Sequence, residues 1–241
     1  IDKNKIIYKS KPKKETDFKI KKKNYLRAYH QCQNCHHFFA NHNYDLEKLY
    51  KKYYSSLTYG SQQKIKATFN KIIDLPIHKS DNKYRVKRVM KIIKKNYKCL
   101  DIGSGLGVFP YELKRKNILV ECLEKDKNLK NHLKLINLKT AKLSILNKNF
   151  RNKFDFISFN KVIEHIQKPD IFVRKFLNLL KFKGYLYIEV PSIKALNNKL
   201  GTMREEFFIE HFHVFSKKST IMFLKKLKLE IIYVKDIVEK S

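Results

Sequence analysis

The sequence predicts an α/β fold of the doubly wound, Rossmann-like type, in which helices cover both faces of a mostly parallel sheet. Between residues 97 and 190, short apolar runs alternate with longer stretches whose apolar residues recur every three or four positions. Such alternation is typical of parallel strands joined by helices. A glycine-rich corner, KCLDIGSGLGVFPYEL at residues 98–113, joins the first apolar run to a helical pattern. A small Cys-containing appendage is expected at the N-terminus.

The individual elements follow from local periodicity and from capping residues. Strands are expected at 97–102, 118–123, 141–145, 154–159, 184–190 and 229–235. Helices are expected at 45–73, 107–116, 126–136, 169–182 and 217–227, the last capped by Ser216. A further helix, capped by Ser80 and Asp81, is expected to run to about Asn96. Residues 25–40 are expected to form two short strands around a Cys pair, and residues 191–215 a loop.

These elements divide the chain into three parts. Residues 1–44 are expected to form a basic tail and a partial zinc-ribbon-like knuckle, residues 45–96 a helical segment over the active site, and residues 97–241 the catalytic core. The chain begins at Ile1 and has one strand-like segment after its last helix, so we expect it to lack its true ends. No apolar run approaches the roughly 20 residues that span a bilayer.

The formal net charge of +32 raises the question of a nucleic-acid partner. Only seven of the 54 basic residues are Arg, the residue that recognises phosphates and guanines with a forked geometry. The Lys residues are spread along the whole chain and are densest in residues 3–23. This composition favours a solvated surface, and we expect no nucleic-acid partner.

The glycine-rich corner indicates the class of cofactor. Gly103, Gly105 and Gly107 stand at alternate positions, whereas a dinucleotide-binding corner needs a third glycine at position 108, which is Val here. Asp101 stands two residues before the first glycine, and Glu124 ends the second strand, 23 residues after Asp101. Carboxylates suit a ligand that carries an ammonium group and ribose hydroxyls rather than phosphates.

S-adenosylmethionine is such a ligand, and we expect it as the cofactor. The residues expected to bind it in this corner are Asp101, Gly103, Ser104, Gly105, Gly107 and Glu124. The plainer alternative is a glycine-rich turn that merely connects a strand to a helix. The spacing to Glu124 and the alternation of strands and helices argue against that alternative.

Together, LDIGSGLG, the acidic end of the second strand and FDFISFNKVIEHIQKP at residues 154–169 resemble the class I S-adenosylmethionine-dependent methyltransferases, in their small-molecule branch. The resemblance implies a doubly wound sheet, usually of seven strands with the last one antiparallel. It also implies that Asn160, Lys161 and Val162 line the methyl-donor site. Glu164 and His165 match the family's Glu-His pair, which either takes part in the site or anchors the following helix.

Cys32 and Cys35 form a C-x-x-C pair that resembles one half of a zinc ribbon, a feature of some sugar and surface-polysaccharide methyltransferases. Zinc needs four ligands, so His36, His37 or His42 would have to complete the site. The alternative is an exposed thiol pair without a metal. Cys99 and Cys122 lie in apolar runs and are expected to be buried thiols, so a reducing cytoplasm is the expected setting.

The run MREEFFIEHFHVFS at residues 203–216 is dense in titratable groups and follows the fifth strand of the core. Ligands of open α/β sheets bind beyond the carboxyl ends of the strands, so this run is expected near the acceptor. His211 and His213, together with His165, are the candidate catalytic residues, because a histidine can remove the acceptor's proton. The alternative is that these histidines only hold the loop.

The expected function is transfer of a methyl group from S-adenosylmethionine to a small acceptor, a sugar or a surface-polysaccharide precursor by family resemblance. Two alternatives stay open. One is an RNA methyltransferase that uses the basic N-terminal region, although the D/N-P-P-Y/F motif is absent at residues 160–163. The other is a non-catalytic binding module on the same fold. The oligomeric state does not follow from the sequence.

Overall fold

The computed structural model describes residues 5–13, 15–18, 20, 25–42, 44, 54–146, 151–196 and 205–237. The chain divides into two compact units, which are described separately. The sheet unit comprises residues 50–160 and 175–188. The histidine unit comprises residues 1–49, 161–174 and 189–238, and contains the three candidate catalytic histidines.

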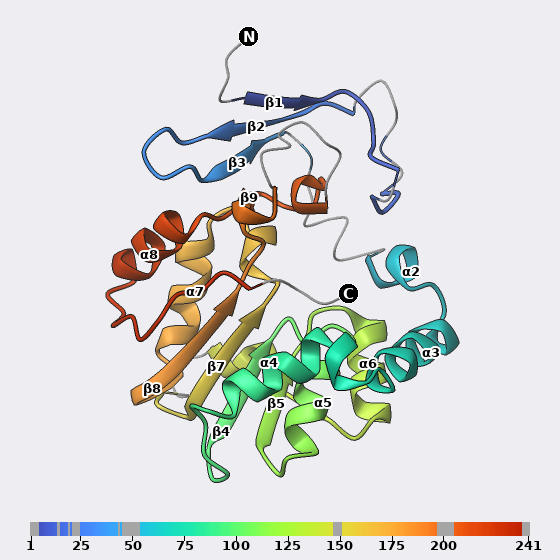
Figure 1. Ribbon diagram of the computed structural model, residues 1–241. Coiled ribbons are helices and arrows are strands. Elements are labelled where there is room, and N and C mark those ends of the chain that lie inside the picture. The colour runs from blue at the N-terminus through green and yellow to red at the C-terminus, as the bar shows by residue number, and fades with distance from the viewer. Residues whose placement is uncertain are drawn as a thin grey trace. The chain divides into compact units, whose positions relative to one another are not determined.

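The sheet unit is built on five strands in the order β6-β5-β4-β7-β8 (Figure 1). Their bounds are β4 Lys98–Ile102, β5 Leu119–Leu123, β6 Lys139–Thr140, β7 Phe154–Asn160 and β8 Leu180–Glu189. The pairs β4–β5, β4–β7 and β5–β6 are parallel, and Asp101 is in register with Cys122 on one side and Ser158 on the other. Parallel neighbours with helices between them confirm the predicted Rossmann-like fold.

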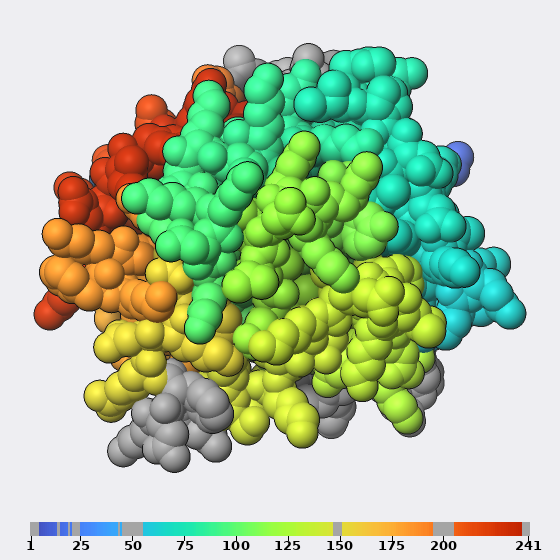
Figure 2. Space-filling model, turned by 90° about the horizontal axis from the view of Figure 1, so that it is seen from below, coloured from blue at the N-terminus to red at the C-terminus, as the bar shows by residue number. Residues whose placement is uncertain are grey.

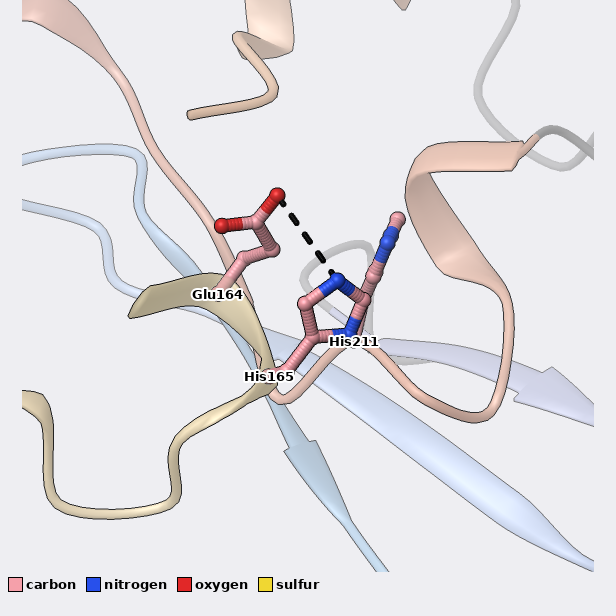
Figure 3. Close-up of side chains that lie close together, drawn as sticks. All are labelled: Glu164, His165 and His211. Atoms are coloured by element: carbon pink, nitrogen blue, oxygen red, sulfur yellow. Dashed lines mark ion pairs between the residues drawn. The ribbon is translucent and has the colours of Figure 1, made fainter. Parts of the chain in front are cut away.

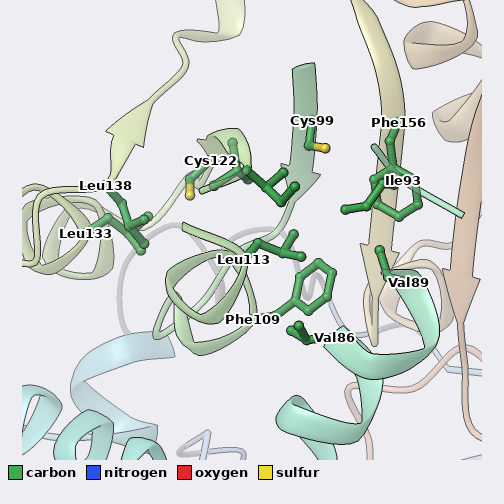
Figure 4. Close-up of a cluster of buried hydrophobic side chains, with 12 residues drawn as sticks. Val86, Val89, Ile93, Cys99, Phe109, Leu113, Cys122, Leu133, Leu138 and Phe156 are labelled. Carbon is green, nitrogen blue, oxygen red and sulfur yellow. The ribbon is translucent and has the colours of Figure 1, made fainter. Parts of the chain in front are cut away.

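Helices cover the sheet because their apolar stripes must be buried. α4 (Asp81–Val89), α5 (Val108–Lys114) and α6 (Lys127–Leu135) contribute to one buried cluster with β4, β5 and β7 (Figure 4). On the sheet's other face, Phe176 of α7 (Pro169–Leu177) contacts Phe159 of β7, with ring centroids 5.5 Å apart. In Figure 2 the side chains of α3 (Gln62–Ile73), α4, α5 and α6 cover one face of this unit, with α4 beside α5 and α3 beside α6.

Capping residues set where these helices begin. Ser61, Ser80 and Asp126 each accept a hydrogen bond from a backbone N–H of the first turn of α3, α4 and α6, respectively. Gly107 precedes α5 with φ of 75°, a left-handed conformation that glycine adopts without penalty. The predicted helix starts at Asp81, 107 and 126 therefore agree with the structure to within about a residue.

Several predicted boundaries were wrong. The run 141–145 is not a strand: β6 ends at Thr140, and Leu143–Leu146 forms a 3-10 helix (η3). The helix predicted to reach Asn96 ends at Val89, because residues 90–92 continue in tighter turns. The helix predicted at 169–182 ends at Leu177, and β8 begins at Leu180 rather than 184. Periodicity alone does not separate short apolar helices from strands.

Two further differences concern a predicted helix that is interrupted and a predicted strand that does not form. Within 45–73, residues 45–53 lie outside the described part, and the remainder is two helices, α2 (Tyr54–Thr58) and α3, separated at Gly60 and Ser61. Gly60 has φ of 80° and Ser61 starts a new helix, which explains the break. The strand predicted at 229–235 is wrong, because these residues form no regular element.

The histidine unit contains a four-stranded antiparallel sheet in the order β1-β2-β3-β9. Its strands are β1 Lys5–Tyr8, β2 Arg27–Gln31, β3 Phe38–Asn41 and β9 His213–Val214. The two strands expected around the Cys pair are thus confirmed as β2 and β3. The predicted loop 191–215, by contrast, also contains β9 and the 3-10 helices η5 (Ile193–Leu196) and η6 (Glu205–Phe207). After it, Ser216 caps α8 (Lys217–Lys226) in a capping box.

A buried charge holds this small sheet to the segment that precedes β9. The side chains of Arg27 and Glu15 are both fully buried and form an ion pair at 3.1 Å. Arg27 also donates to the carbonyl of Phe207, and Glu15 accepts from the N–H of Ile209 at 2.6 Å. Tyr29 donates to the carbonyls of Phe208 and His211, at 2.8 and 2.7 Å. The N-terminal residues therefore determine the path of residues 207–211.

None of the helices in the described part of the chain has the length and hydrophobicity that a membrane-spanning helix requires.

Candidate active site

The three glycines of the corner in the sheet unit have different roles, although all three have positive φ. A Cβ on Gly107 would lie 2.4 Å from Leu133 and 3.0 Å from Leu138, so this glycine allows α5 and α6 to pack closely. A Cβ on Gly105 would meet no atom within 4 Å, so space lies above its backbone. Gly103 is exposed and donates its N–H to the carbonyl of Leu123 at 2.8 Å.

Glu124, at the end of β5, lies against this corner as the spacing predicted. One carboxylate oxygen accepts the N–H of Gly105 at 2.8 Å. The other oxygen accepts the N–H groups of Lys125 and Asp126, at 2.7 and 2.9 Å. A carboxylate offers about four acceptor positions. Three are therefore occupied by backbone donors, and one remains for a hydroxyl of a ligand.

Asp101, at the end of β4, orients other side chains. It is buried, and its Oδ1 accepts from Ser158 Oγ at 2.6 Å and from Asn160 Nδ2 at 2.9 Å. Ser104 donates to the Asp101 carbonyl at 3.0 Å. A carboxylate only accepts, so the Asn160 amide must turn its NH₂ group toward Asp101 and its oxygen away.

The resulting position of the Asn160 carbonyl oxygen matters for binding. Asn160 Oδ1 is buried and has no hydrogen-bond partner among the described residues. A buried acceptor without a donor is costly, and such atoms are rare in folded proteins. A ligand with an ammonium group would satisfy it.

Burial also changes the ionisation of Asp101. Burial raises the pKa of this carboxyl to about 6. The hydrogen bonds from Ser158, Ser104 and Asn160 and the positive charge of Arg85 lower the pKa but do not cancel the effect of burial. The carboxylate is therefore ionised at neutral pH and takes up a proton in mild acid.

The two residues that follow Asn160 begin the other unit. Lys161 has φ of 56°, an uncommon conformation for a residue with a side chain, and donates its N–H to the carbonyl of Glu189 at 2.9 Å. Val162 is half-buried and precedes the 3-10 helix η4 (Ile163–His165). Strained backbone is often found at functional sites.

The histidine unit brings Glu164, His165 and His211 together (Figure 3). One potential ligand atom from each of the three side chains lies within 4.8 Å of the other two. The imidazole rings of His165 and His211 are 4.7 Å apart between centroids, and His165 Nε2 is 3.9 Å from a Glu164 oxygen. We call these three residues the Glu-His-His cluster. The side chain of Glu164 is 1% exposed and that of His165 19%.

Hydrogen bonds fix the tautomers of both histidines in the cluster. His165 Nδ1 lies 3.0 Å from the Glu210 carbonyl, and His211 Nδ1 lies 3.0 Å from the Glu206 carbonyl. Carbonyl oxygens cannot donate, so both Nδ1 atoms carry the proton. Burial lowers the pKa of His165 to about 4 and that of His211 well below its usual value, so both rings are neutral at pH 7. Each Nε2 therefore presents a lone pair.

His213, the third candidate catalytic residue, lies apart from this cluster. Its Nε2 is 3.3 Å from the Gln167 carbonyl, and its Nδ1 is 3.0 Å from His37 Nε2. Since the carbonyl requires a donor, His213 Nδ1 accepts the His37 proton. Both ring nitrogens are thus engaged in holding β9 (His213–Val214) to neighbouring segments.

The Cys pair lies in the turn between β2 and β3. Cys32 and Cys35 are free thiols, and the Glu-His-His cluster is the one group of potential metal ligands among the described residues. His37 contacts His213, and His42 stacks on Phe212 with ring centroids 5.0 Å apart. The structure therefore gives no support for zinc at Cys32 and Cys35.

Sequence reasoning missed two residues of these sites. Ser158 stands two positions before Asn160 on a strand, so alternation places both side chains on one face, and this signal was available. Arg27 had no such signal, because a buried Arg cannot be distinguished from the many exposed basic residues by its type alone.

Comparisons with known proteins agree with this geometry. Residues 78–234 match a family model described as a methyltransferase domain. No curated protein matches the sequence.

Among solved structures, a Haloferax volcanii complex of the Trm112 methyltransferase activator and a protein described as a methyltransferase gives a TM-score of 0.58 at 13% identity, over 72% of this chain and 76% of that one. A SAM-dependent methyltransferase from Thermotoga maritima gives 0.54 at 17% identity, over 70% and 80%. A protein from Bacillus halodurans C-125 described as a methyltransferase gives 0.50 at 16% identity, over 60% and 68%.

At these identities, the solved structures show a shared fold. The family match covers the glycine corner, Asn160 and the Glu-His-His cluster, and it spans well over half of the sequence. The chain belongs to the methyltransferase domain family, is an enzyme of the class I type, and has S-adenosylmethionine as its expected cofactor.

Proposed function

We propose that this enzyme transfers a methyl group from S-adenosylmethionine to a hydroxyl group of a small acceptor, a sugar or a surface-polysaccharide precursor. The observation that carries the proposal is the buried, unpartnered Oδ1 of Asn160, which Asp101 orients. The choice of acceptor rests on the resemblance of residues 154–169 and 203–216 to the branch that modifies small molecules.

The residues of the glycine corner fit the cofactor. Asn160 Oδ1 would accept from its ammonium group, the open space above Gly105 would admit it, and Glu124 has one acceptor position for a ribose hydroxyl. Gly103, Ser104, Lys161 and Val162 would border the cofactor, while Gly107 acts by allowing helix packing. When bound, S-adenosylmethionine supplies a methyl group already activated by its sulfonium.

The acceptor's proton must leave as its oxygen attacks the methyl carbon. We assign assistance in this step to His165 and His211, because each has its Nδ1 bonded to a carbonyl and its Nε2 left with a lone pair. We assign a positioning role to His213, since both of its nitrogens are engaged. The four free cysteines support a reducing, cytoplasmic setting.

The test is incubation of the full chain with methyl-labelled S-adenosylmethionine and a panel of sugars and nucleotide sugars, with RNA as a separate arm. Mass spectrometry should find an acceptor that gains one methyl group and should detect S-adenosylhomocysteine. Asn160→Leu should weaken cofactor binding, whereas His211→Gln should slow transfer with cofactor affinity unchanged. Methylation of RNA alone, with strong salt dependence, would favour the RNA alternative.

A further inference from the structure

We infer that the Glu-His-His cluster binds a divalent transition-metal ion, and that His165 and His211 act on the acceptor's proton through this ion. Binding of the ion is independent of the proposed function, and only its chemical role rests on that function. The inference starts from three ligand atoms, one each from Glu164, His165 and His211, that lie within 4.8 Å of one another.

Two imidazole nitrogens and one carboxylate oxygen define the class of ion. Imidazole suits Zn²⁺, Fe²⁺, Co²⁺ and Ni²⁺, whereas Mg²⁺ and Ca²⁺ prefer oxygen ligands alone. Three protein ligands leave one or more coordination positions open, which is typical of catalytic rather than structural metal sites. The side chain of His165 is 19% exposed, so it is the more accessible member of its pair with Glu164.

The second shell of the cluster matches that of metal-binding histidines. A ligating histidine donates its other ring N–H to a carbonyl or carboxylate, which fixes the tautomer and directs the lone pair at the metal. His165 and His211 both do so, toward the carbonyls of Glu210 and Glu206. Those carbonyls belong to the segment that Arg27, Tyr29 and Glu15 hold in place.

The distances require only a small closure. In a tetrahedral zinc site with bonds of about 2.0–2.1 Å, ligand atoms lie about 3.4 Å apart. His165 Nε2 and the Glu164 oxygen are already 3.9 Å apart. The three ligand atoms all lie within 4.8 Å of one another, so no pair would have to approach by more than about 1.4 Å.

One charge opposes the ion. Lys161 is close enough for its charge to lower the pKa of both His165 and His211. The carboxylate of Glu164 offsets this charge within the cluster.

The ion would assist the transfer as a Lewis acid. An acceptor hydroxyl bound at an open position loses its proton to water more readily. Its oxygen forms the bond to the methyl carbon, and the electron pair of the carbon–sulfur bond stays with sulfur. The products are the methyl ether, S-adenosylhomocysteine and one proton.

The test uses Co²⁺ as the probe, because its visible spectrum reports on nitrogen and oxygen ligands and a separate near-ultraviolet band reports on thiolates. The full chain, stripped with a chelator, should bind one Co²⁺ with a visible band. Glu164→Gln and His211→Gln should each weaken binding at least about 100-fold, more than the 10–100-fold typical of second-shell changes.

Matched variants exclude the other ligands of the chain. His213→Gln removes a histidine outside the cluster, and Cys32→Ser with Cys35→Ser removes the thiol pair, so neither should alter the band. Circular dichroism of each variant, and Co²⁺-dependent thermal stabilisation, separate loss of the site from loss of the fold.

A spectrum that His211→Gln leaves unchanged, or a thiolate band that the Cys variant abolishes, would overturn the inference, as would absence of saturable binding. Failure of the metal test with intact cofactor binding and methyl transfer would leave the proposed function standing. Metal binding without any methyl transfer would support the metal site and contradict the proposed function.

Discussion

The two units build their sites in opposite ways. In the sheet unit, Asp101, Gly105 and Glu124 lie at the ends of adjacent parallel strands that share an apolar core, and a hydrogen bond from Gly105 to Glu124 joins the two strand ends. In the histidine unit, Glu164 and His165 come from one segment and His211 from another, and a buried ion pair between Glu15 and Arg27 holds the segment of His211. The comparison shows that a site can depend on apolar packing in one unit and on a buried charge in the other.

The largest effect is expected where the buried charge is removed. Arg27→Met leaves Glu15 buried without its partner, which typically costs about 3–5 kcal/mol. We expect hydrogen exchange to accelerate at the amides of β2, β3 and residues 205–214, while S-adenosylmethionine still binds. The double variant Arg27→Met with Glu15→Gln should recover much of the loss. Unchanged exchange in Arg27→Met would contradict the role given to this ion pair.

Next in size is the substitution Gly107→Ala in the sheet unit. The left-handed conformation costs a side chain about 1–2 kcal/mol, and a Cβ would lie 2.4 Å from Leu133, an overlap worth about 1–3 kcal/mol. We expect urea denaturation to show a loss of about 2–4 kcal/mol. Gly105→Ala is the matched control, since its Cβ meets no atom within 4 Å. Gly105→Ala should lose only the stability that the left-handed backbone conformation costs, about 1–2 kcal/mol, yet it should impair cofactor binding. Equal stability losses would refute the division of roles between these glycines.

Asp101→Asn should affect binding rather than stability. An Asn at this position offers the Asn160 amide a weaker acceptor, and hydrogen bonds to charged groups contribute about 1.5–3 kcal/mol. Calorimetry should therefore show S-adenosylmethionine affinity reduced about 10–100-fold. Asp155→Asn is the control, because Asp155 bonds Lys98 and Lys181, at the start of β4 and in β8. Similar affinity losses in both variants would indicate a general effect of charge.

The smallest effect is a pH dependence of cofactor binding. Burial raises the pKa of Asp101 to about 6, so the carboxylate loses its charge as the pH falls through that value. A protonated carboxyl no longer fixes the Asn160 amide, and affinity should fall by up to about tenfold per pH unit below pH 6. Affinity should be level above pH 7. Asp101→Asn should show no such dependence, and a slope that persists in that variant would assign the titration to another group.

The sheet unit was largely predictable from the sequence, and the histidine unit only in part. The strand and helix alternation, the capping residues Ser80 and Asp126, and the pairing of Gly105 with Glu124 all depend on residues close in sequence or on neighbouring strands. Errors arose where a short apolar run, such as 141–145, fits both a helix and a strand.

The histidine unit is assembled by contacts across long sequence separations. Phe39 pairs with His213, and Arg27 reaches the carbonyl of Phe207. No local pattern specifies such partners. The sequence therefore indicated His211 and His213 as candidate catalytic residues, but it could not show that His165 contacts His211 and not His213. For the Cys pair, local spacing suggested a zinc site as one of two alternatives, whereas the potential ligands that meet among the described residues are Glu164, His165 and His211.

We propose that S-adenosylmethionine binds at the corner formed by Asp101, Gly105, Glu124 and Asn160. Calorimetric titration of the full chain with S-adenosylmethionine, and separately with NAD, tests it most directly. We expect saturable one-site binding of S-adenosylmethionine that Asn160→Leu weakens strongly, and no heat of binding with NAD. Binding of NAD at this corner, or S-adenosylmethionine affinity that is indifferent to Asn160, would contradict it.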